Sequence, residues 1–131
     1  MSQFQWPVTV YIEDTDAGGI VYYVNYLKYM ERARSEWLRR YDVTQQALLQ
    51  TGIQLVVHRL DCRYVKPARL DEQLQVSVSV ESATSCRLCF HQEVTRRGEG
   101  ICDARVDIAC IDAARGKPTR WPTALAAAIH G

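Results

Sequence analysis

The sequence lacks a long apolar run and has no excess of charge of either sign. No stretch approaches the roughly 20 apolar residues that a membrane-spanning helix needs, so we expect no integral membrane segment. Sixteen Lys and Arg residues stand against 15 Asp and Glu residues, a formal net charge of +1. That balance predicts no whole-chain attraction to nucleic acid or to an anionic membrane. Recognition of an anionic small molecule must therefore come from a local group of cations.

Signals for export and for metal binding are also missing. The first residues have neither the basic end nor the apolar core of a secretion signal. The five cysteines, an odd number, indicate reduced thiols and a cytoplasmic location. Cys86 and Cys89 form a CxxC pair, but they fall in an alternating pattern that would point them to opposite faces of a strand. No second pair and no nearby His completes a zinc set, so we expect neither metal nor cofactor.

Hydrophobic periodicity predicts one domain over residues 1–131, with helices and strands in a defined order. A long amphipathic helix is expected over residues 25–40 with Asn25 as its N-cap, and a short helix over 44–49 capped by Thr44. Another short helix is expected over residues 124–129. Strands are expected over residues 8–12, 53–65, 74–81, 86–94 and 104–111.

This order predicts an α+β fold in which one long helix lies on an antiparallel sheet, with the last four strands in meander-like succession. One sheet covers one side of one helix, which leaves the other sheet face or a sheet edge open to water. A second copy of the chain is a natural cover, so we predict a homo-oligomer, either a dimer or a tetramer.

The most informative segment lies between the first strand and the long helix. Acidic residues at 13, 14 and 16 are followed by Gly18 and Gly19, which predicts a tight loop whose backbone can approach a ligand closely. A purely structural explanation also exists, because Asp14 and Asp16 can bond their own backbone.

Residues 14–27, DTDAGGIVYYVNYL, resemble the 4-hydroxybenzoyl-CoA thioesterase group of hotdog-fold proteins. Residues 30–38, MERARSEWL, and 64–72, YVKPARLDE, extend the likeness to the Tol–Pal-associated acyl-CoA thioesterases of the YbgC type, over nearly the whole chain. The resemblance implies a hotdog fold, with one long helix wrapped by a five-stranded antiparallel sheet. It also implies catalytic dimers, often paired into tetramers, with sites at the subunit interface. The implied substrate is an acyl-CoA, and acyl carrier protein is a further implied partner.

The resemblance assigns two catalytic roles. Asp16 matches the catalytic carboxylate of the family, and Tyr23 matches the position whose backbone N–H polarises the thioester carbonyl. Many YbgC-type members carry His where this chain has Tyr23, so a role for that His side chain does not carry over. The backbone role does, because any residue except proline supplies an N–H.

These residue types suit thioester hydrolysis. The leaving thiol has a pKa near about 8.5, so it departs as a thiolate with little help from an acid. An ionised aspartate can attack the carbonyl carbon directly or deprotonate a water molecule, and the sequence does not separate the two. Donors at a helix N-terminus that face the thioester oxygen can stabilise the transition state by about 3 kcal/mol.

Residues for substrate binding follow from position and charge. Gly18 and Gly19 would let the acyl group pass close to the backbone, and Tyr22 and Asn25 flank the helix start. The phosphates of coenzyme A need cations. The candidates are Lys66 and Arg69 on either side of Pro67, and a cluster after the last strand, Arg115, Lys117 and Arg120.

Three alternatives remain open. Glu31 on the long helix is a rival base, although a solvated or ion-paired glutamate explains it more simply. A dehydratase on acyl-CoA or acyl carrier protein calls for a His base, and no His lies in the motif. A non-catalytic subunit that binds acyl-CoA or acyl carrier protein would share the fold, and the intact Asp16 argues against it.

Overall fold

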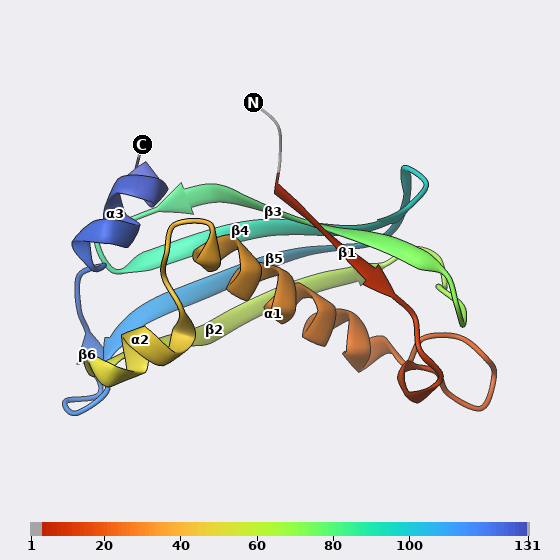
Figure 1. Ribbon diagram of the computed structural model, residues 1–131, viewed down its shortest axis with the longest axis horizontal. Coiled ribbons are helices and arrows are strands. Elements are labelled where there is room, and N and C mark those ends of the chain that lie inside the picture. Colours follow the sequence, from red (N-terminus) through yellow and green to blue (C-terminus); the bar gives the residue numbers. More distant parts are fainter. Residues whose placement is uncertain (1–3, 131) are drawn as a thin grey trace.

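A long helix, α1 (Tyr23–Arg39), lies across one face of an antiparallel sheet in the computed structural model, which describes residues 4–130 (Figure 1). The other elements, in chain order, are β1 (Phe4–Thr9), the 3-10 helix η1 (Ile12–Asp14), α2 (Gln45–Gln50), β2 (Ile53–Tyr64), β3 (Gln73–Ala83), β4 (Arg87–Arg96), β5 (Glu99–Asp112), β6 (Lys117–Pro118) and α3 (Thr123–His130). The strand order is β1-β3-β4-β5-β2, and β6 pairs with the end of β5. The predicted α+β hotdog architecture is confirmed, with β6 as a short addition to five long strands.

The position of β2 corrects the expected strand succession. A meander places β2 beside β3, but β2 pairs with β5 along its length, from Ile53 opposite Asp112 to Tyr64 opposite Cys102. Only β3, β4 and β5 follow one another as neighbours. The chain crosses the sheet after β2, so that strands flank α1 on both sides (Figure 1).

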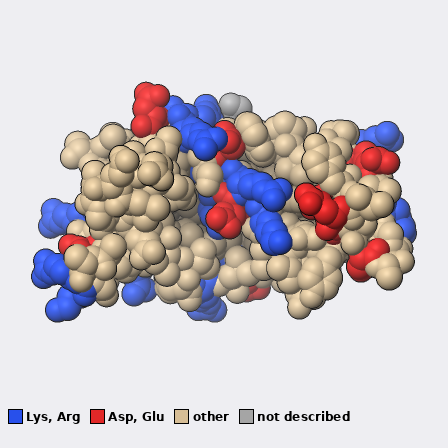
Figure 2. Space-filling view, turned by 60° about the horizontal axis from the view of Figure 1, so that its bottom comes forward, with Lys and Arg blue, Asp and Glu red and all other residues tan. Residues whose placement is uncertain are grey.

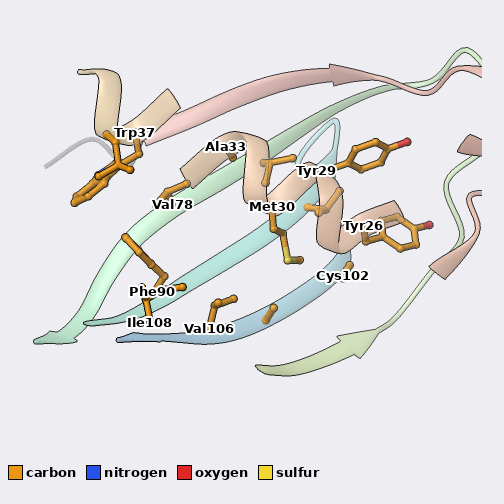
Figure 3. Packing of buried hydrophobic residues seen from close by; sticks show 14 of the residues in the cluster. Tyr26, Tyr29, Met30, Ala33, Trp37, Val78, Phe90, Cys102, Val106 and Ile108 are labelled. Carbon is orange, nitrogen blue, oxygen red and sulfur yellow. The ribbon is translucent and has the colours of Figure 1, made fainter. Parts of the chain in front are cut away.

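The apolar stripe of α1 forms the centre of the core. Tyr26, Met30, Ala33 and Trp37 recur at helical spacing, and all four are buried against the sheet (Figure 3). The Trp37 and Phe90 rings meet edge to face with centroids 5.2 Å apart. The period-3.6 pattern therefore decides which face of the helix meets the strands.

The start of α1 differs from the prediction. The N-cap is Tyr22 rather than Asn25, and it makes no side-chain capping bond. Asn25 lies inside the first turn, where its side-chain Nδ2 donates to the Asp14 backbone oxygen at 2.8 Å. A polar residue near a helix start thus ties the helix to the preceding loop instead of capping it.

The first strand also lies earlier than expected. β1 contains Pro7, opposite Gln75 of β3. Proline is tolerated there because β1 is an edge strand and needs no N–H on its open side. The expected strand over residues 8–12 is therefore wrong beyond Thr9, and Ile12 begins η1 instead.

Short-range signals predicted several elements correctly. Thr44 caps α2 by accepting a hydrogen bond from the Ala47 N–H at 3.1 Å, and α3 forms where the alanine-rich segment lies. Arg97 and Gly98 both have positive φ, 52° and 80°, which gives the two-residue turn between β4 and β5. Among residues 4–130, no helix combines the length and apolar character that crossing a bilayer requires.

Candidate active site

The loop between η1 and α1 folds back on itself as a small hairpin. The Asp16 N–H donates to the Ile20 oxygen at 2.9 Å, and Thr15 and Val21 form a bridge. One step further, the Tyr22 N–H donates to the Asp14 oxygen at 2.9 Å. Asp16 therefore lies two pairs along the hairpin from Tyr22, the N-cap of α1.

The Asp16 side chain is exposed and is held by its own loop. Its Oδ1 accepts a hydrogen bond from the Gly18 N–H at 2.8 Å. A Cβ on Gly18 would lie 3.2 Å from that oxygen, so a side chain there would press on the carboxylate. Gly19 has φ +80°, a conformation that glycine adopts without the strain other residues incur. Glycine is therefore favoured at position 18 by the space beside the Asp16 carboxylate and at position 19 by the backbone conformation of the loop.

Asp14 connects the loop to the residues around it. It is buried, and its Oδ2 accepts a hydrogen bond from the Tyr11 N–H at 2.9 Å. Its backbone oxygen receives the Asn25 side chain. Burial, with a further contribution from the nearby Asp14 carboxyl, raises the pKa of the Tyr29 phenol. Asp14 fixes the loop to the helix, which leaves Asp16 as the acid of the motif that faces solvent.

The first N–H groups of α1 supply hydrogen-bond donors beside this loop. The N–H groups of Tyr23 and Val24 precede the first hydrogen bond of the helix ladder, and neither has an acceptor within the described part of the chain. The positive end of the helix dipole adds to their attraction for a developing negative charge. An oxygen from a ligand can therefore bind at the helix start.

Aromatic rings form one wall of the helix start. The Tyr22 and Tyr23 ring centroids are 5.0 Å apart, and Tyr64 of β2 meets Tyr23 at 5.9 Å and Tyr26 at 5.7 Å. Tyr23 is 55% exposed, so this wall is open in a single chain. The contact between β2 and the helix start joins segments far apart in sequence, and no local pattern indicated it.

A pair of thiols lies beside Tyr64. The sulfur atoms of Cys62 and Cys102 are 3.2 Å apart. The hydrogen bond between them lowers the pKa of Cys62 to about 7 and raises that of Cys102. One of the two thiols therefore shares its proton with the other sulfur in a hydrogen bond, close to Tyr64 of the aromatic wall.

One of the two predicted basic groups lies beside the loop. Arg69 forms a backbone bridge with Ile20, and the Tyr26 hydroxyl fixes the same segment by accepting the Ala68 N–H at 3.0 Å. Lys66 is ion-paired to Glu99 at 2.8 Å, although its side chain remains half exposed. Arg69 is thus placed close to Asp16 by the backbone.

The second basic group lies elsewhere. Arg115, Lys117 and Arg120 surround β6, at the opposite end of the molecule from the Asp16 loop (Figure 1). Within one chain, the two predicted groups of cations do not come together. The sequence could not reveal this separation, because it does not show which ends of the strands lie together.

Comparison with known proteins identifies the family. The chain matches the family described as Thioesterase-like superfamily over residues 10–129. The chain belongs to this family. It is 41% identical over 128 residues to the acyl-CoA thioesterase YbgC of Haemophilus influenzae, covering 97% of this chain and 94% of that protein. It is 38% identical over 125 residues to the acyl-CoA thioester hydrolase YbgC of an Escherichia coli O6:H1 strain, covering 95% and 93%.

A solved structure agrees with the sequence relatives. The structure of a probable thioesterase from Bartonella henselae has a TM-score of 0.86 and 30% identity, covering 92% of this chain and all of that one. The predicted resemblance is therefore confirmed, and the protein is an enzyme of the thioesterase class.

The rival residues of this thioesterase lie away from the Asp16 loop. Glu31 is exposed on α1, and no ion pair within 4.0 Å holds it among the described residues. His91 pairs with Asp103 at 2.6 Å, between strands β4 and β5. Sequence reasoning did not identify the hydrogen bond between Arg34 of α1 and the buried Gln92 of β4.

Proposed function

We propose that this thioesterase hydrolyses acyl-CoA, with Asp16 as nucleophile or general base and the N–H of Tyr23 as the donor that polarises the carbonyl. The observation that carries the proposal is the exposed Asp16 carboxylate, held by Gly18 on the hairpin that leads into α1. The first donors of α1, the Tyr23 and Val24 N–H groups, have no acceptor among residues 4–130. The names of the YbgC relatives supply the substrate class. Tyr22 and Gly19 complete the immediate surroundings of the thioester.

The reaction needs little besides these groups. With the thioester oxygen at the helix start, donors there stabilise the developing oxyanion by about 3 kcal/mol. Asp16 then attacks the carbonyl carbon to give a mixed anhydride, or removes a proton from the attacking water. The thiolate of coenzyme A leaves without an acid. After direct attack, water opens the anhydride. A single turnover in ¹⁸O-water that leaves solvent oxygen in the Asp16 carboxylate identifies direct attack with water addition at the Asp16 carbonyl, because the general-base route labels only the released acid.

We further propose that the functional unit is a dimer that pairs β2 with its own copy. Within the described residues, β2 has a neighbour on one side only, β5. Four of its exposed residues are apolar: Val56, Val57, Leu60 and Tyr64 are each at least 38% exposed, and they alternate with exposed polar residues such as Arg59 and Asp61. Figure 2 brings forward the lower side of Figure 1, where β2 lies, and shows uncharged areas on both sides of a central charged group. A long edge with apolar side chains favours pairing with another strand.

The dimer would unite the two basic groups. An antiparallel β2 pair has a two-fold axis through the strand's middle, so the end of one subunit that carries Asp16 lies beside the other subunit's β6 end. Arg115, Lys117 and Arg120 would then face Arg69 and Lys66 across the interface. This arrangement gives the coenzyme A phosphates cations from both chains.

The location and further partners belong to the same proposal. All five cysteines are free, as expected in the reducing cytoplasm. Acyl carrier protein, a tetramer and a Tol–Pal connection remain predictions from the resemblance.

A thiol-release assay across short, long and aromatic acyl-CoAs tests the activity. We expect Asp16→Asn to lose at least about 100-fold in kcat while folding normally, because an asparagine oxygen can still accept the Gly18 N–H. The matched control is Glu31→Gln. It makes the same change, from a carboxylate to an amide, at the rival base, and it should leave the enzyme active. An active Asp16→Asn beside a dead Glu31→Gln contradicts the assignment. A wild-type protein that binds acyl-CoA but hydrolyses none would be a binding subunit.

A further inference from the structure

Two thiols from neighbouring strands lie in contact near the start of α1. Cys62 belongs to β2 and Cys102 to β5, and their sulfur atoms are 3.2 Å apart. The two residues are diagonal neighbours in the antiparallel register, where Cys62 lies opposite Ala104 and Cys102 lies opposite Tyr64. A disulfide bond is about 2.05 Å long, so the two sulfur atoms need to approach by only about 1 Å to become bonded.

The two thiols differ in access and in acidity. Cys62 is half-buried at the margin of the core, whereas Cys102 is buried on the sheet beneath the first turns of α1 (Figure 3). The hydrogen bond from Cys102, together with the Tyr64 hydroxyl, lowers the pKa of Cys62 to about 7, and the same thiol pairing raises the pKa of Cys102. Because the thiolate is the nucleophilic form of cysteine, Cys62 is the member of the pair that reacts first with a small molecule.

Two of the other three thiols have the opposite tendency. Burial, with the nearby Asp107 carboxyl, raises the pKa of Cys89 to about 12, and burial raises the pKa of Cys110 to about 11. Such thiols stay protonated at neutral pH and exchange slowly with disulfides. Oxidation is therefore directed to Cys62, and the sulfur in contact with it is that of Cys102.

Tyr64 connects the thiol pair to the helix start. It follows Cys62 by two residues in β2 and lies opposite Cys102 of β5. Its ring meets the rings of Tyr23 and Tyr26, with centroids 5.9 and 5.7 Å apart. A bond between the two sulfurs would draw together the strands on both sides of Tyr64. Since a displacement of about 1 Å in an active site can cost about 100-fold in rate, this movement is large enough to affect catalysis.

We propose that Cys62 and Cys102 form a reversible disulfide that slows thioester hydrolysis at the adjoining helix start. The effect on hydrolysis rests on the proposed function. The oxidant is a low-molecular-weight disulfide. The Cys62 thiolate attacks one of its sulfur atoms, which forms a mixed disulfide and releases one small thiolate. Cys102 then attacks the Cys62 sulfur and releases the second small thiolate, and the two thiolates take up the protons of the two cysteines. The protein loses two electrons and two protons, and the oxidant becomes two thiols. In a reducing compartment such a bond is transient, as expected of a regulatory disulfide.

Peptide mapping tests the bond itself, with glutathione disulfide as the probe. The purified oligomer is oxidised, alkylated and cleaved by trypsin after Lys and Arg, which gives residues 60–63 and 98–105 as separate peptides with one cysteine each. We expect these two peptides to be joined, with no glutathione on either. In Cys102→Ala, residues 60–63 should instead carry one glutathionyl group, because the second thiol is missing. Cys110→Ala is the matched control: it removes another buried thiol of β5 and should form the same bond as wild type.

Kinetics of the oxidised enzyme test the effect on hydrolysis. The oxidant is removed by gel filtration, and acyl-CoA hydrolysis is followed by the loss of thioester ultraviolet absorbance, which needs no thiol reagent. We expect kcat to fall by about 10- to 100-fold after oxidation and to return when dithiothreitol reduces the bond. Cys62→Ala, which replaces a half-buried residue, should keep its kcat through the same treatment, whereas Cys110→Ala should respond as wild type does.

The outcomes distinguish this inference from the proposed function. A reduced wild-type protein that is inert on every acyl-CoA overturns the proposed function. Three results overturn the inference and leave acyl-CoA hydrolysis standing: the two peptides are never joined, kcat is unchanged once they are joined, or Cys62→Ala loses as much activity on oxidation as wild type.

Discussion

Replacing Gln92 with leucine tests how far the buried polar group between α1 and the sheet stabilises the fold. Gln92 is fully buried and makes three side-chain hydrogen bonds, one of them to the guanidinium of Arg34. Leucine fills nearly the same space and makes none of them. The perturbation therefore removes polar contacts from the core with little change in packing.

The magnitude follows from what each partner loses. The Met30 and Ser77 carbonyls lose about 1 kcal/mol each at most, because each oxygen belongs to a regular element. Arg34 loses a charge-assisted bond of about 1.5–3 kcal/mol, at a position where burial already lowers its pKa. Better burial of an apolar side chain offsets about 1–2 kcal/mol. We expect Gln92→Leu to lower the free energy of unfolding by about 3 kcal/mol.

Urea unfolding at one fixed protein concentration measures this value, since oligomer stability depends on concentration. The Arg34→Met, Gln92→Leu double variant is the decisive companion. It removes the buried charge together with its partner, so it should be more stable than Gln92→Leu alone. If the two single changes simply add in the double variant, Arg34 and Gln92 do not act as a pair, and the reasoning about this polar group between α1 and the sheet is refuted.

Two further predictions concern the loop glycines and the thiols. Gly18→Ala should lower kcat with little change in Tm, because its Cβ crowds Asp16. Gly19→Ala should destabilise the fold by about 1 kcal/mol, because φ at this position is positive. Thermal unfolding and the thiol-release assay measure both variants, and equal effects on Tm would contradict the distinction. Alkylation of Cys62 should reach half its maximal rate near pH 7, since its lowered pKa makes the thiolate available from that pH upward. In Cys102→Ala the midpoint should rise toward about 8.5, and an unchanged midpoint would refute the shared proton.

Local signals in the sequence predicted much of the fold, but they did not predict the contacts between segments that are far apart in the sequence. The buried face of α1 and the Thr44 cap depend on residues a few positions apart, so periodicity and capping chemistry sufficed. The partner of β2 depends on which strand best covers the far side of α1, a choice made by the whole core. Asn25 failed as a cap for the same reason, because its side chain had a better acceptor in Asp14, eleven residues earlier.

The candidate site likewise has a local part, which the sequence predicts, and a part built from distant segments, which it does not. The hydrogen bonds that position Asp16 lie between Asp14 and Tyr22, so a short motif contains the residues that fix the carboxylate in this chain. By contrast, the cavity of about 220 Å³ between α1 and the sheet is lined by residues scattered from Glu31 to Leu125. A motif can therefore identify thioester chemistry while leaving the acyl group open. Substitutions in α1, in the strands or in the C-terminal segment can change that lining without altering the catalytic loop, because none of the lining residues belongs to the loop.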